Sequence, residues 1–60
     1  MTAFALYRPS PDDAGTTVFT RQAVVSTAKA ACREALYRGL FIKEYETAAE
    51  APKTIIEPAK

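Results

Sequence analysis

The sequence predicts an α+β fold: a two-layer sandwich in which one amphipathic helix packs on a small antiparallel sheet, in the order strand, short strand, helix, strand, strand. Three observations support this prediction. Residues 2–8 have the two-residue alternation of a strand, residues 21–38 repeat apolar side chains at helical spacing, and the segments 40–46 and 54–57 are rich in aromatic and β-branched residues. Because the chain has 60 residues, we expect a single domain over residues 1–60.

The first strand is expected over residues 2–8. Its side chains divide between two faces, with Phe4 and Leu6 on one and Ala3, Ala5 and Tyr7 on the other. Pro9 is expected to end this strand, and residues 10–15 are expected to turn the chain, because proline, aspartate and glycine each favour turns. The β-prone residues 16–19 are expected to pair back on the first strand as a hairpin.

The central helix is expected over residues 21–38, with Thr20 as its N-cap. A rotation of about 100° per residue places a set of small and apolar side chains on the buried face: Val24, Ala28, Ala31 and Ala35 along its centre, with Val25, Cys32 and Leu36 beside it. Gly39 is the expected left-handed residue after the helix, and Arg38 complements the helix dipole. The alanines imply that the helix closely approaches the sheet.

Residues 40–51 fit either a strand or a second helix. We favour a strand over residues 40–46, because Gly39 interrupts helical structure and because aromatic and β-branched residues prefer strands. Residues 54–57 are expected to be its hairpin partner, with residues 47–53 as the connecting loop. One helix covers one face of a sheet, so the other face is expected to meet solvent, a second copy or another protein.

The residue types argue against an enzyme. The chain has no histidine and a single cysteine, Cys32, which excludes an internal disulfide and a Cys/His zinc site. Without a histidine to act as a base, Cys32 is expected to be a packed side chain with an inert thiol. Two glycines are too few for a glycine-rich phosphate-binding loop. We therefore predict no catalytic residue, no metal site and no cofactor.

The sequence also carries no targeting signal that we recognise. The N-terminus lacks the basic and apolar regions of a secretory signal, and no segment approaches the about 20 apolar residues of a membrane-spanning helix. A lone cysteine is typical of a reducing compartment. We therefore expect a cytoplasmic protein with no membrane partner.

The polar side of the expected helix is the first candidate binding surface. Ser26, Lys29, Arg33 and Tyr37 follow one another along it at helical spacing. Lys29 and Arg33 are like charges four residues apart, and arginine and tyrosine are enriched at the energetic centres of protein interfaces. We expect this line to contact an acidic surface of a larger protein; a solvated helix face is the alternative.

The sheet face turned away from the helix is the second candidate surface. Strand alternation places four residues there, Tyr7, Phe41, Lys43 and Tyr45. Monomeric proteins seldom expose large apolar patches, so this face is expected to form a homodimer or to dock onto a target. Aromatic rings on an open sheet also resemble, in general chemistry, the base-stacking platforms of single-strand nucleic-acid binders.

These features predict a non-catalytic protein-binding module that acts by occupying a surface of a larger protein or complex, as inhibitors and accessory factors of phages and other mobile elements do. A nucleic-acid-binding protein that uses the basic helix line or the aromatic sheet face is the first alternative. The net charge of +1 argues against it, because proteins that track phosphates usually carry a strong basic excess. An obligate structural subunit or homo-oligomer is the second alternative.

Overall fold

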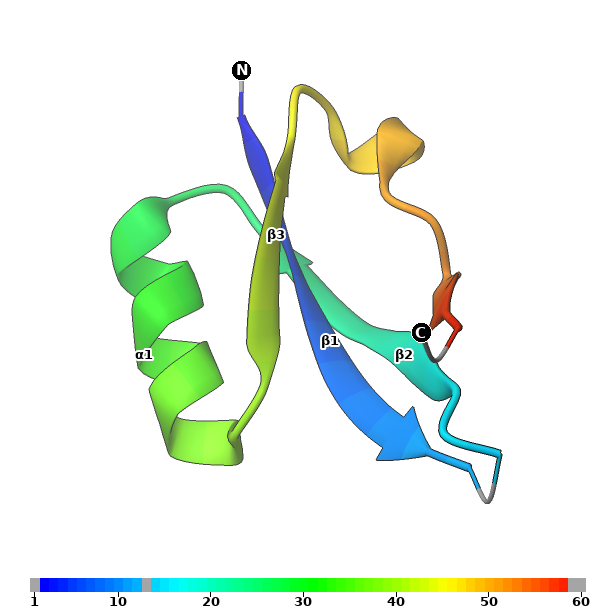
Figure 1. Cartoon of the computed structure of the whole chain (residues 1–60). Coiled ribbons are helices and arrows are strands. Elements are labelled where there is room, and N and C mark those ends of the chain that lie inside the picture. Colours follow the sequence, from blue (N-terminus) through cyan, green and yellow to red (C-terminus); the bar gives the residue numbers. More distant parts are fainter. Residues whose placement is uncertain (1, 13, 59–60) are drawn as a thin grey trace.

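The fold is a curved antiparallel sheet with an α-helix on one face. A computed structural model describes residues 2–12 and 14–58. Within these ranges the elements are, in chain order, β1 (Ala3–Pro11), β2 (Thr17–Val25), α1 (Ala28–Arg38), β3 (Phe41–Tyr45), the short 3₁₀ helix η1 (Ala48–Glu50) and β4 (Thr54–Glu57). The strands lie in the order β3-β1-β2-β4 (Figure 1). The predicted α+β arrangement of one helix on a small antiparallel sheet is confirmed.

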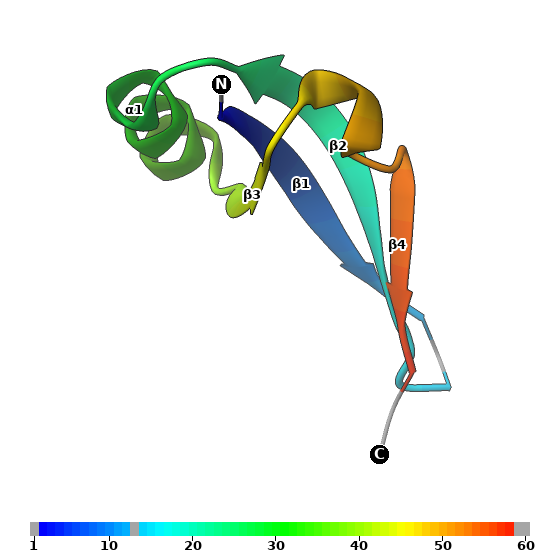
Figure 2. The ribbon, with the colours of Figure 1, turned by 90° about the horizontal axis from the view of Figure 1, so that it is seen from above.

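β1 and β2 form a long hairpin at the centre of the sheet. Their pairing begins at Phe4 with Val25, and the register shifts between Leu6 and Tyr7. Such a β-bulge bends the strand that carries it and increases its twist, in agreement with the curved sheet of Figure 2. The predicted pairing of the first two strands is confirmed, although both strands are longer than expected.

Pro9 does not end β1, contrary to the prediction. β3 pairs with β1 only as far as Tyr7. Pro9 and Pro11 therefore lie where β1 has no neighbour on that side, and an edge tolerates a residue that cannot donate a ladder hydrogen bond. The proline that looks like a strand end in the sequence thus marks the end of β3 pairing instead.

The turn between β1 and β2 is held by Asp12. Its Oδ1 atom accepts hydrogen bonds from the backbone N–H groups of Ala14 and Thr16, both at 2.9 Å. Gly15 has a φ of +87°, a conformation that glycine adopts without steric cost. A turn lies here as predicted, but Ser10 and Pro11, which were expected in it, belong to β1. Asp13 and residues 59–60 lie outside the described residues.

The helix begins later than the sequence predicts. Residues 21–25 continue β2, and Thr20 lies within that strand, so its expected role as N-cap is wrong. Thr27 caps α1 instead, and its Oγ1 accepts a hydrogen bond from the Ala30 N–H at 3.2 Å. At the other end, Gly39 has a φ of +67° and provides the predicted left-handed termination.

Removing the Thr27 hydroxyl is expected to destabilise the protein. Thr27→Ala should lower the free energy of unfolding by about 1 kcal/mol, because the first turn of α1 loses an acceptor for one of its free N–H groups. Urea unfolding followed by circular dichroism measures this loss. Thr27→Ser is the matched control, since serine keeps the hydroxyl and should retain most of the stability; equal losses in both variants would contradict the capping role.

β3 and β4 lie at opposite edges of the sheet. β3 pairs with β1 and β4 pairs with β2, so the predicted hairpin between residues 40–46 and 54–57 is wrong. The strand favoured over a second helix after Gly39 is confirmed. The segment between the two strands contains η1 and crosses the face opposite α1, which we call the back face of the sheet (Figure 2).

The core consists of two clusters, one on each face of β1. On the helix side, the buried residues Leu6, Ala31 and Leu40 pack with Phe4, Ala23, Val25 and Ala35. On the back face, the buried residues Ala5, Tyr7 and Ala51 pack with Phe19, Val24, Tyr45 and Ile55. The predicted orientation of Phe4 and Leu6 toward the helix is confirmed. Val24, which was expected on the buried helix face, belongs to the other side of the sheet.

The helix buries less of its surface than predicted. Ala31 is buried and Ala35 is half-buried against the sheet, as expected. Ala28, Cys32 and Leu36 are exposed, so their predicted burial is wrong. Since α1 has 11 residues and begins at Ala28, it meets the sheet along one short strip of small side chains.

Candidate functional site

The side of α1 turned away from the sheet carries five exposed residues, which we call the helix outer face: Lys29, Cys32, Arg33, Leu36 and Tyr37. At about 100° per residue they lie opposite Ala31, with the two cations at the centre and Leu36 and Tyr37 on either side. Leu36 is 88% exposed and Tyr37 is 90% exposed. Two large apolar side chains therefore project into solvent beside two positive charges.

The cations at the centre of this face have no ion-pair partner within the described part of the chain. The ion pair on α1 joins Arg38 to Glu34 at 3.8 Å and does not include Lys29 or Arg33. No acidic residue occupies the first turn of α1, where a carboxylate would complement the helix dipole. The helix outer face is consequently both apolar and positively charged.

The structure changes the composition of the predicted helix line. Lys29, Arg33 and Tyr37 lie along α1 as expected, whereas Ser26 precedes the helix in the bend after β2 and is exposed there. Sequence reasoning missed Leu36, because the longer predicted helix placed that side chain against the sheet. Knowledge that α1 begins at Ala28 would have placed Leu36 on the exposed side of the helix.

The back face of the sheet is more closed than the sequence predicts. Of the four residues expected there, Tyr7 is 2% exposed and Tyr45 is half-buried, while Phe41 and Lys43 remain exposed. All four follow the predicted strand alternation. Tyr7 is nevertheless part of the core. The exposed part of the expected aromatic patch is therefore limited to residues of β3.

Two hydrogen bonds fasten the η1 segment over the back face. The Tyr7 hydroxyl donates to the Pro52 carbonyl at 2.7 Å, and Arg21 Nη1 donates to the Ala51 carbonyl at 2.8 Å. Burial raises the pKa of Tyr7 to about 12; the neighbouring Tyr45 adds to the rise, and the charge of Arg21 opposes it. Tyr7 and Arg21 thus act as a structural latch.

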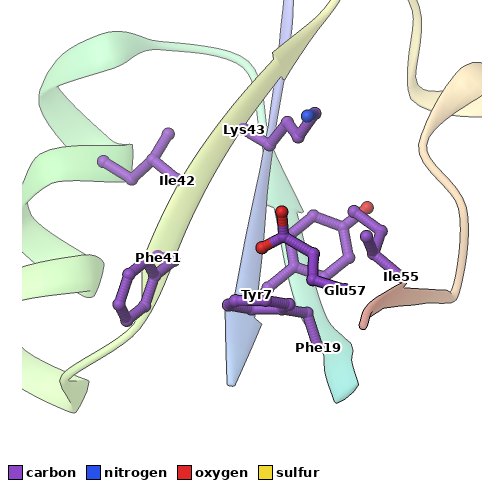
Figure 3. Close-up of a pocket in the computed structure, with 7 residues that line it drawn as sticks. All are labelled: Tyr7, Phe19, Phe41, Ile42, Lys43, Ile55 and Glu57. Atoms are coloured by element: carbon purple, nitrogen blue, oxygen red, sulfur yellow. The ribbon is translucent and has the colours of Figure 1, made fainter. Parts of the chain in front are cut away.

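A small hollow remains on the back face between β3 and β4 (Figure 3). The rings of Phe19 and Phe41 meet edge to face there at 5.6 Å, and Ile55 packs beside them. Lys43 lines it from β3, and the carboxylate of Glu57 turns toward its middle from β4. Sequence reasoning missed the contributions of β2 and β4, because they depend on the strand order.

The volume of the hollow limits what it can bind. It encloses about 100 Å³, whereas small-molecule sites usually measure about 300–1,000 Å³. A wider recess of about 510 Å³ near the start of β1 has Glu46 as its one charged lining residue. The volume of this recess falls within that range, and the polar residues Thr2, Ser26 and Thr47 line it beside Glu46. The described residues also contain no cluster of three His, Cys, Asp or Glu side chains placed to hold a metal ion.

Comparison with protein-family models, with curated proteins and with solved structures finds no match to this chain. Across residues 2–12 and 14–58, no helix combines the length and the hydropathy needed to cross a bilayer.

Proposed function

We propose that the chain is a non-catalytic protein-binding module that uses the helix outer face to occupy an acidic surface of a larger protein. The observation that carries this proposal is the nearly complete exposure of Leu36 and Tyr37 beside Lys29 and Arg33. Arginine and tyrosine are among the residues most enriched at the energetic centres of protein interfaces.

Burial of these side chains supplies a driving force for association. Covering a fully exposed leucine contributes about 1.5–3 kcal/mol, and tyrosine offers a large rigid surface with a polar end that keeps its hydrogen bond at an interface. Leu36 and Tyr37 flank the centre of the helix outer face, so one partner surface that covers this face reaches both of them.

The charges of this face do nothing for the stability of α1 itself. Lys29 lies in the first turn, where the helix dipole disfavours a cation. Lys29 and Arg33 are also like charges four residues apart, an arrangement that costs a helix about 0.2–0.5 kcal/mol. A partner with carboxylates opposite them gives both cations a role, and it favours rapid association through electrostatic attraction.

A module of this kind regulates by occupancy, blocking or adjusting the surface that it covers. Inhibitors and accessory factors carried by phages and other mobile elements act in this way, and the chain fits that type in its size and in its lack of a histidine or a second cysteine.

Reversing the charge of Arg33 is expected to weaken partner binding without unfolding the protein. Arg33→Glu places a carboxylate at the centre of the helix outer face, so at least a tenfold loss of affinity, about 1.4 kcal/mol, is expected toward an acidic partner. The measurement is affinity capture from host lysate with quantitative mass spectrometry, followed by titration of the purified captured protein. Thermal unfolding of the variant checks that its stability is unchanged.

Lys43→Glu is the matched control, because it makes the same charge change on the back face. It should leave binding intact. Loss of binding in Lys43→Glu but not in Arg33→Glu would assign the partner to the sheet instead. Salt-sensitive binding of DNA or RNA in a filter assay, lost in Arg33→Glu, would replace the acidic protein by a nucleic acid.

A further inference from the structure

We propose that two copies of the chain associate by antiparallel pairing of their β4 strands, which joins two four-stranded sheets into one. β4 is the last strand in the order β3-β1-β2-β4, and within the described residues no strand pairs with its outer edge. An unpaired edge presents backbone groups that another strand can bind. This inference is independent of the proposed function, because β4 lies at the far side of the molecule from α1 (Figure 2).

The hydrogen bonds of β2 with β4 show which backbone groups of β4 are free. The Arg21 N–H donates to the Lys53 carbonyl at 2.9 Å, which makes these two residues a hydrogen-bonded pair. Since such pairs alternate along an antiparallel ladder, Lys53, Ile55 and Glu57 direct their backbone groups toward β2. Thr54 and Ile56 therefore direct their N–H and C=O groups outward.

A two-fold axis and this alternation allow few registers. Side chains opposite each other share a sheet face, so the axis passes through a residue position. Centred on Ile55, Thr54 lies opposite Ile56 of the second copy, and the two symmetric pairs form four hydrogen bonds. Centred on Ile56, Thr54 lies opposite Pro58 of the second copy, which has no N–H to donate. That register also gives four hydrogen bonds, two of them between the Ile56 residues, but the other two need Pro58, which lies outside β4. The register centred on Ile55 keeps all four within β4 and is therefore favoured.

The favoured register is also complementary in charge. It places Lys53 opposite Glu57 of the second copy, and the symmetry repeats this pair on the other side of the axis. Opposite charges directly across an antiparallel ladder stabilise the pairing. On the other sheet face, Ile56, which is 64% exposed, packs beside Thr54 of the second copy.

The opposite edge of the sheet lacks this complementarity. Full antiparallel self-pairing of β3 (Phe41–Tyr45) is centred on Lys43 and sets that lysine against its own copy. Charged residues in the middle of an edge strand are a common protection against pairing. β4 has none in its middle, because Ile55 and Ile56 occupy it; Glu57 is its last residue and Lys53 directly precedes it. β4 is thus the edge suited to a second copy.

The test is sedimentation velocity of the purified chain from micromolar to millimolar concentration. The wild-type protein should show a reversible monomer–dimer equilibrium. Lys53→Glu and Glu57→Lys each create two like-charge pairs and should raise the dissociation constant at least about tenfold. An equimolar mixture of the two variants restores opposite charges at both pairs and should dimerise like the wild type, as should the double variant Lys53→Glu/Glu57→Lys.

Two further variants keep the proposal falsifiable. Lys43→Glu changes the charge equally at the other edge and should leave dimerisation unchanged. Ile56→Pro removes the outward N–H but no hydrogen bond to β2. It should therefore stay folded by circular dichroism and sediment as a monomer. A wild-type chain that stays monomeric at millimolar concentration, or a mixture that associates no better than its components, overturns the proposal.

Discussion

Leu6→Ala is expected to leave the chain largely unfolded at room temperature. Leu6 is 0% exposed and joins β1 to Ala31 of α1 and to Leu40 in the helix-side cluster. Replacing a buried leucine by alanine costs about 2–5 kcal/mol through lost burial and the cavity left behind. Cores of this size supply about 3–5 kcal/mol of stability in total. Far-UV circular dichroism and urea unfolding measure the loss.

Leu36→Ala is the matched control for this experiment. It removes the same atoms from a side chain that has almost no contact with the rest of the protein, so the free energy of unfolding should change by less than about 0.5 kcal/mol. A Leu6→Ala chain that unfolds cooperatively with the wild-type midpoint would show that the helix-side cluster contributes little.

The sequence predicts the fold class because its strongest signals are local. The alternation in residues 2–8 assigns Phe4 and Leu6 to the helix side, and Gly39 identifies the end of the helix. The start of the helix was misplaced because Val24 fits the helical spacing of Ala31 and Ala35, although valine prefers strands. Pairing with β1, a contact between distant segments, decides in favour of the strand.

The candidate surfaces depend on long-range contacts to a greater degree. Strand alternation correctly places Tyr7 on the back face, but its burial comes from the η1 segment that crosses over it. The predicted hairpin between the last two strands is wrong for a similar reason. The sequence shows that two strands exist, but it does not show their order in the sheet. Leu36 and the β4 edge emerge as exposed features only once α1 and the sheet order are known.

The wild-type protein is expected to lose stability steeply between pH 10 and pH 12. Tyr7 has an ordinary pKa of 10.0 when unfolded and about 12 when folded, so above pH 10 the folded state holds a proton that the unfolded state has released. Its contribution is fully present below pH 10 and is lost as the pH rises toward 12. The slope reaches about 1.4 kcal/mol per pH unit. Urea unfolding at several pH values measures it.

Tyr7→Phe distinguishes the contribution of the hydroxyl to stability from the contribution of the ring. At neutral pH the variant should be less stable by about 1 kcal/mol, because the Pro52 carbonyl loses its donor. Its stability should then fall less steeply above pH 10, so the two curves approach each other. Tyr37→Phe removes the same hydroxyl from an exposed ring and should leave the stability at neutral pH unchanged. Parallel curves for wild type and Tyr7→Phe would mean that the latch over the back face does not form, because a Tyr7 open to solvent would ionise equally in both states.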